Sequence, residues 1–169
     1  MARSVLMLVE LALRYVKMLV AFALLWAGLW AYNTYGCVRV EGGEMEPAVA
    51  RGANKMIRPG VRLPEDLRHD DFIVYSAAVQ GKAPRVFAGR VLGLPGDRIR
   101  LENGEVVRNG TRLASPYVPA NQRTQDDYPE IVVPRDSVFV LGDSRRTAAA
   151  SDSRAVGPVG RWAILGRLP

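Results

Sequence analysis

The stretch Arg85–Leu113, RVFAGRVLGLPGDRIRLENGEVVRNGTRL, has the pattern of short β-strands joined by tight turns. Its first part, residues 85–94, is rich in β-forming side chains, and residues 98–113 alternate polar with apolar residues. Asn-Gly occurs at 103–104 and again at 109–110, and this dipeptide tolerates the positive φ angles of hairpin turns. Residues 98–113 are therefore predicted to form a small antiparallel meander.

Further strands are expected on both sides of this stretch. The segments DFIVYS (71–76), EIVVP (130–134), SVFVLGD (137–143) and WAILGRL (162–168) are short, β-rich and bounded by turn-forming residues. Residues 38–169 are thus predicted to be one mostly-β domain of many short antiparallel strands.

An uncharged segment precedes this domain. Residues 18–32, MLVAFALLWAGLWAY, carry no charge. Extended back to Tyr15 and on to Tyr35, the segment reaches about twenty residues, enough for a helix to cross ~30 Å of hydrocarbon. Trp26 and Trp30 lie near its far end, and Arg14 and Lys17 precede it. By the positive-inside tendency, we expect a single-pass anchor in the cytoplasmic membrane, with residues 1–37 as cytoplasmic stub and anchor and residues 38–169 extracytoplasmic.

Other interpretations of this segment stay open. A cleaved secretory signal usually ends in a small-x-small site, which YNTYG (32–36) lacks. A lipoprotein would use Cys37, but the aliphatic residue expected three positions before it is missing. A buried core helix would need a polar face, which residues 18–32 do not have.

The net charge and the distribution of basic residues limit the classes of binding partner that the sequence predicts. The formal net charge is +6, and the basic residues are dispersed among acidic ones. Without a basic stripe interleaved with aromatic residues, the lipid bilayer is a better expected partner than nucleic acid. The one cysteine excludes a disulfide within the chain.

Three separated segments together resemble the type I signal peptidase family, the membrane-anchored serine proteases with a Ser-Lys dyad. The matching positions are Met45, Pro47, Arg90, Gly93, Pro95, Gly96, Asp97, Gly142, Asp143, Arg145, Asp152, Ser153 and Arg154. They occur in the family's order and spacing over nearly all of residues 38–169. The resemblance implies a signal-peptidase-like β fold, with a tight turn at residues 93–97 and charge pairing among Asp143, Arg145, Asp152 and Arg154.

The two catalytic positions depart from the family. The serine that would attack the scissile carbonyl falls on Glu44, and the lysine that would accept its proton falls on Gly89. A further family serine becomes Ala150. No catalytic residue is therefore assigned, and the resemblance implies neither a cofactor nor a metal.

The sequence thus predicts a signal-peptidase-like pseudoenzyme, a binding or assembly subunit in the membrane. Its expected partners are an active signal peptidase paralogue or a larger membrane complex, and an extended peptide in the former substrate groove. In that groove, Glu44 is either a neutral replacement that drifted after activity was lost, or a residue that excludes a signal-peptide end or pairs with Arg90 or Arg154. Two alternatives remain: an active signal peptidase with an unusual or partner-supplied mechanism, and a LexA-like autoprotease relative, against which the anchor argues.

Overall fold

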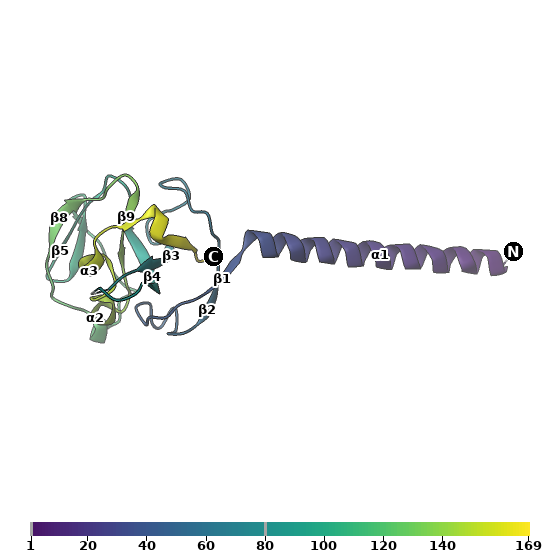
Figure 1. The fold of residues 1–169 in the computed structure, drawn as a ribbon, viewed down its shortest axis with the longest axis horizontal. Helices are drawn as coiled ribbons and strands as arrows, with labels where there is room; N and C mark the ends of the chain where they lie inside the picture. Colours follow the sequence, from purple (N-terminus) through teal and green to yellow (C-terminus); the bar gives the residue numbers. More distant parts are fainter. Residues whose placement is uncertain (1, 80) are drawn as a thin grey trace. The chain divides into compact units, whose positions relative to one another are not determined.

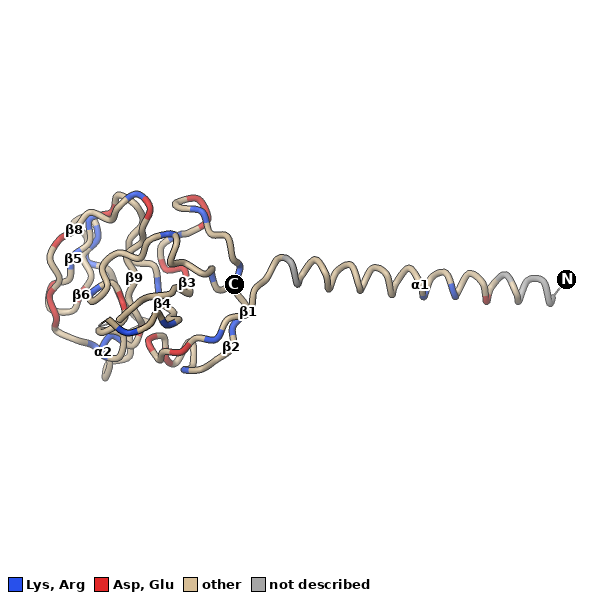
Figure 2. The backbone as a smooth tube through the Cα atoms, viewed as in Figure 1, with Lys and Arg blue, Asp and Glu red and all other residues tan. Residues whose placement is uncertain are grey.

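The computed structural model describes residues 2–79 and 81–169 and divides the chain into two units, one ending at Gly36 and the other Cys37–Pro169. The first unit is helix α1 (Ala2–Thr34), drawn in purple in Figure 1. Within it, Val9–Ala31 is long and apolar enough to cross a membrane, and its residues are not buried inside the protein. No charged residue follows Lys17 in this helix (Figure 2). The core-helix interpretation is therefore wrong, and the exposed apolar surface suits a membrane anchor.

The second unit is mostly β, as predicted. Its main sheet has the order β10-β9-β4-β3-β11 and is antiparallel throughout. These strands are β10 (Val159–Gly160), β9 (Ser137–Leu141), β4 (Arg85–Gly93), β3 (Phe72–Ala77) and β11 (Ile164–Arg167). A two-stranded sheet pairs β1 (Gly36–Arg39) with β2 (Asn54–Ile57).

The predicted meander forms a second large sheet of order β7-β6-β5-β8. Its strands are β7 (Thr111–Arg112), β6 (Glu105–Arg108), β5 (Arg98–Glu102) and β8 (Tyr128–Val132). Asn103 and Asn109 adopt φ of 49° and 51°, and the glycine after each also has positive φ. Both Asn-Gly pairs therefore make the tight turns that their sequence indicates.

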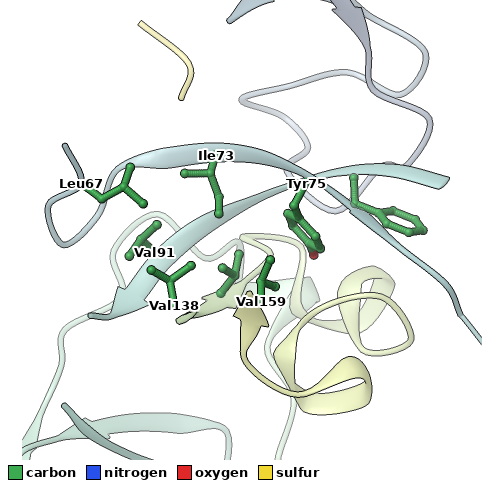
Figure 3. Packing of buried hydrophobic residues seen from close by; sticks show 8 residues of the cluster. Leu67, Ile73, Tyr75, Val91, Val138 and Val159 are labelled. Atoms are coloured by element: carbon green, nitrogen blue, oxygen red, sulfur yellow. The ribbon is translucent and has the colours of Figure 1, made fainter. Parts of the chain in front are cut away.

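Alternate residues of the main sheet enter different parts of the core. Ile73, Tyr75 and Val91 lie in one cluster with Val138 and Val140 of β9 (Figure 3). The opposite side of β4 and β9 packs against the meander in a second cluster. In a third, the loop before β2 packs on β3 and β4. The main sheet is thus buried on both faces.

Short helical turns complete the unit: η1 (Ala120–Gln122), α2 (Arg145–Ala148), α3 (Ser153–Val156) and η2 (Arg161–Ala163). The segment with α2 and α3 follows β9 and leads into β10. Asp152 caps the first turn of α3, because its side chain accepts a hydrogen bond from the backbone N–H of Arg154. This segment and the loop between β1 and β2 carry the candidate site.

Candidate functional site

Glu44 lies in the loop between β1 and β2, and its side chain is buried, with 5% of the residue exposed. The Ser151 hydroxyl donates to Glu44 Oε1 at 3.1 Å, and the backbone N–H of Ser144 donates to the Glu44 carbonyl at 2.8 Å. Glu44 Oε2 has no hydrogen-bond partner among the described residues. Burial raises the pKa of Glu44, although the hydrogen bonds oppose the shift.

Gly89 lies in β4 opposite Ile73 of β3 and has no room for a side chain. A Cβ there would collide with Val140 Cγ1 and approach Tyr75 Cε1 to 3.3 Å. The position at which the family resemblance expects the lysine is therefore filled from both neighbouring strands.

Tyr75 links the two degenerate positions. Its ring borders Gly89, and its hydroxyl donates to the Ser151 carbonyl at 3.0 Å. Burial raises the pKa of Tyr75, and the charges of Asp152 and Glu44 raise it further. Tyr75, Ser151 and Glu44 thus form a continuous buried network across the site.

Sequence reasoning missed Ser151 and Tyr75 as members of the site. Ser151 directly follows Ala150, the position at which the family has a serine. Shifting that assignment by one residue would have placed Ser151 in the site. Tyr75 pairs with Phe87 in the hairpin of β3 and β4, two residues from Gly89. Pairing these strands by their facing apolar residues would have placed the Tyr75 ring beside the glycine.

The guanidinium of Arg90 pairs with Asp143 and not with Glu44. Its Nε and Nη2 donate to the two carboxylate oxygens of Asp143 at 2.9 and 2.7 Å. The guanidinium lies between two aromatic rings, 4.3 Å from the Phe72 centroid and 3.7 Å from that of Tyr117. The expected pairing of Glu44 with Arg90 is therefore wrong: a bidentate and stacked guanidinium satisfies its donors better than a distant carboxylate would.

Arg154 makes a second carboxylate clamp. Its Nε and Nη2 donate to Asp152 at 3.0 and 2.6 Å, and its Nη1 donates to Asp126 at 2.8 Å. The expected pairing of Glu44 with Arg154 is wrong for the same reason. Asp126, in the loop before β8, is a partner that sequence reasoning missed.

Arg145 does not join this charge pairing. It is 2% exposed, and its Nε and Nη2 have no hydrogen-bond partner among the described residues. Its backbone carbonyl accepts a hydrogen bond from Arg154 Nη2 at 2.6 Å. The expected four-residue network is therefore two separate clamps with Arg145 beside them.

The remaining family-matching residues support the backbone. Asp97 closes the turn after Gly93 by accepting from the Leu94 N–H at 2.8 Å, and it also contacts His69 Nε2 at 2.7 Å. Ser153 Oγ accepts from the Val140 N–H at 2.8 Å. The others divide by burial: Met45 and Gly142 are buried, and Pro47 is exposed. At Pro95 and Gly96 the turn itself is formed, with Gly96 at φ 90°.

One hydroxyl at the site faces a carboxylate. Ser151 donates to Glu44, and both side chains are buried. Among the residues that the structure describes, no three His, Cys, Asp or Glu side chains gather as metal ligands.

Comparison with known proteins gives a consistent answer. The sequence profile described as "Signal peptidase, peptidase S26" matches residues 12–169. The signal peptidase I of Bacillus amyloliquefaciens is 28% identical over 120 residues, which cover 66% of this chain and 62% of that protein. The signal peptidase I P of Bacillus subtilis subsp. natto is 27% identical over 121 residues, covering 66% and 63%. The chain therefore spans less than two thirds of the length of these curated relatives.

A solved structure is similar in fold. The crystal structure of a signal peptidase I from Enterococcus faecalis superposes with a TM-score of 0.50 at 24% sequence identity. The superposition covers 65% of this chain and all of that one. At this identity the likeness concerns the fold, and it agrees with the mostly-β architecture of residues 37–169.

Proposed function

The chain belongs to the S26 family of signal peptidases, and from this premise we propose that it is a membrane-anchored member that does not cleave peptide bonds. It acts instead as a binding or assembly subunit. The domain after the anchor lies on the outer face of the cytoplasmic membrane. Its partner there is an active signal peptidase or a larger membrane complex, and an extended peptide occupies the former groove.

The observation that carries this proposal is the closed space at Gly89. A Ser-Lys mechanism needs a neutral amine within reach of the hydroxyl. Val140 and the Tyr75 ring occupy the space into which a side chain at residue 89 would extend. Position 89 therefore has neither an amine nor the room for one.

Glu44 supports the same conclusion. A carboxylate is a poor nucleophile towards amides, and a mixed anhydride would revert. The Glu44 side chain is also buried and hydrogen-bonded to Ser151, which removes it from an incoming peptide. Its burial favours the protonated, neutral form, the less nucleophilic one.

A second candidate function rests on the 3.1 Å contact between Ser151 Oγ and Glu44 Oε1. A serine that donates to a carboxylate has the arrangement of a nucleophile and its general base. This would make the chain a peptidase with an unusual dyad. Against it, the Ser151 hydroxyl is 3.3 Å from the Ala148 carbonyl as well, and Ser151 is 4% exposed.

The test is cleavage of a secretory precursor by the full-length protein in detergent, beside the signal peptidase I of Bacillus amyloliquefaciens as positive control. We expect no cleavage by the wild type. Cleavage that Ser151→Ala abolishes would establish the second candidate and refute the first. Cleavage that survives Ser151→Ala would refute both.

A gain-of-function variant sharpens this test. Glu44→Ser with Gly89→Lys restores the two side chains, but the lysine has no space beside Tyr75 and Val140. Adding Tyr75→Ala and Val140→Ala opens that space. Cleavage by the fourfold variant, and none by the double variant, would show that packing as well as chemistry keeps the site inactive.

A further inference from the structure

Three charged residues lie on one side of α1, within the part of the helix that is apolar enough to cross a membrane. Glu10, Arg14 and Lys17 belong to Val9–Ala31, and all three are exposed (Figure 2). Because an α-helix turns by about 100° per residue, spacings of four and three residues place them within roughly 60° of its circumference. They therefore form one narrow charged stripe along the helix.

The rest of this part of the helix is apolar. Between positions 9 and 17, the residues outside the stripe are Val9, Leu11, Ala12, Leu13, Tyr15 and Val16. Such a helix would expose a wide apolar face to water if it projected from the bilayer. A helix of 23 residues is about 34 Å long, which is close to the ~30 Å of a hydrocarbon core. Val9–Ala31 as a whole thus fits the bilayer, with the stripe in the half nearer its N-terminus.

Charges at this depth are costly unless they are paired. Lys17 follows Val9 by eight positions, which is about 12 Å along the helix axis. Ionisable residues inside a membrane span generally face other protein and pair there. Pairing of Glu10 with Arg14, four positions apart, would satisfy two of the charges within the helix and leave Lys17. The stripe therefore has the composition of a protein contact and not of a lipid-facing surface.

A second copy of this chain is a poor occupant of the stripe. Two copies inserted in the same direction and meeting along it bring equal positions to equal depth, so that Glu10 faces Glu10 and Lys17 faces Lys17. Like charges opposite one another in a helix interface act against that pairing. The stripe instead favours a helix that carries the opposite order of charges.

We propose that Glu10, Arg14 and Lys17 form the contact face for the membrane helix of a different protein. That helix carries a basic residue at the depth of Glu10 and acidic residues at the depths of Arg14 and Lys17. The inference rests on the proposed assembly role and deepens it, because it assigns that role to α1. The two proposals fail separately, since association of helices is measured without any cleavage assay.

The experiment measures energy transfer from the native tryptophans of the full-length protein to synthetic helices in detergent micelles. Trp26 and Trp30 lie near the C-terminal end of α1, and each synthetic helix carries a dansyl acceptor at its C-terminus. The synthetic helices have about 25 leucine and alanine residues. The complementary helix contains Lys, Glu and Glu at spacings of four and three, the reversed helix contains Glu, Lys and Lys at the same positions, and the neutral helix contains no charge.

We expect the wild type to bind the complementary helix about tenfold more tightly than the other two, since single polar contacts between membrane helices are modest and three act together. A protein with its own stripe reversed, Glu10→Lys with Arg14→Glu and Lys17→Glu, is the matched control and should prefer the reversed helix.

Equal binding of the three helices by the wild type would overturn the proposal and would indicate that the charges extend to the lipid headgroups instead. Tighter binding of the reversed helix by the wild type would also overturn it. Sedimentation equilibrium in the same detergent tests the second copy. A wild-type dimer that dissociates when the stripe is reversed would assign the stripe to self-association and overturn the assignment to a different protein.

Discussion

The two arginine–aspartate clamps, Arg90–Asp143 and Arg154–Asp152, pair their buried charges, whereas the buried carboxylate of Glu44 at the site contacts a hydroxyl. In the clamps, Asp143 and Asp152 are almost fully buried, and each is gripped by two nitrogens of an arginine. At the site, Glu44 is buried with one hydroxyl partner, and its Oε2 has no partner among residues 2–79 and 81–169; Gly89 is packed by Val140 and Tyr75. The clamps therefore pair buried carboxylates with arginine, while the carboxylate at the site has a hydroxyl partner and a raised pKa.

The largest change in stability is expected when the arginine of one clamp is removed. Arg154→Met leaves Asp152 buried, with no exposure, and without its counter-ion, so the free energy of unfolding should fall by about 3–5 kcal/mol. Chemical denaturation followed by circular dichroism measures it. Arg112→Met is the matched control, since Arg112 pairs with Glu102 on the exposed surface and should cost less than about 1 kcal/mol. Equal losses in the two variants would remove the distinction between clamp and surface pair.

A second test adds volume at the closed centre. Gly89→Ala places a methyl group against Val140 and Tyr75, which should lower the free energy of unfolding by about 1–3 kcal/mol. Gly160→Ala serves as control, because its Cβ would meet nothing within 4 Å and its φ of −68° suits any residue. Combining Gly89→Ala with Val140→Ala should cost less than the sum of the two single changes. A Gly89→Ala protein as stable as wild type would mean that the centre is open.

The smallest effect concerns the charge at Glu44 and depends on pH. Burial holds its pKa in the folded protein above the ordinary value of 4.5, so the folded state binds this proton more tightly than the unfolded chain. Wild-type stability should therefore fall relative to Glu44→Gln as pH rises from 4.5 towards neutrality, and the gap should close below 4.5. Asp152, whose pKa burial also raises, is present in both proteins, and its charge contributes to the raised pKa of Glu44.

This comparison is made by denaturing the wild type and Glu44→Gln at neutral and acidic pH. Glu46→Gln, which changes an exposed neighbour, is the matched control. A Glu44→Gln protein that is less stable than wild type at neutral pH would indicate that the carboxylate is stabilised by a charge, contrary to its unpartnered oxygen.

Local patterns in the sequence predicted the fold well. The turns at Asn103 and Asn109 follow from the conformational freedom of two adjacent residues, and the strand patterns follow from alternation along the chain. Such features depend on near neighbours, which the sequence displays directly. The strand segments expected around the meander accordingly appear as β3, β8, β9 and β11.

The site was harder to predict because its contacts join distant residues. The contact of Glu44 with Ser151 spans 107 positions, and that of Arg90 with Asp143 spans 53. The sequence correctly indicated that charges in the third family segment would pair, but it could not indicate which ones. Arg145 was expected to pair, but its Nε and Nη2 have no hydrogen-bond partner in the part of the chain that the structure describes.

Cys37 carries the single thiol of the chain and can therefore be labelled selectively. It is the one cysteine of the chain, it is exposed, and it lies at the first residue of the β unit, three positions after α1 ends. A maleimide that cannot permeate lipid therefore reacts with this protein at one place, next to the membrane segment. Whether this reagent labels the protein in intact cells shows on which side of the bilayer the β unit lies, without any engineered residue.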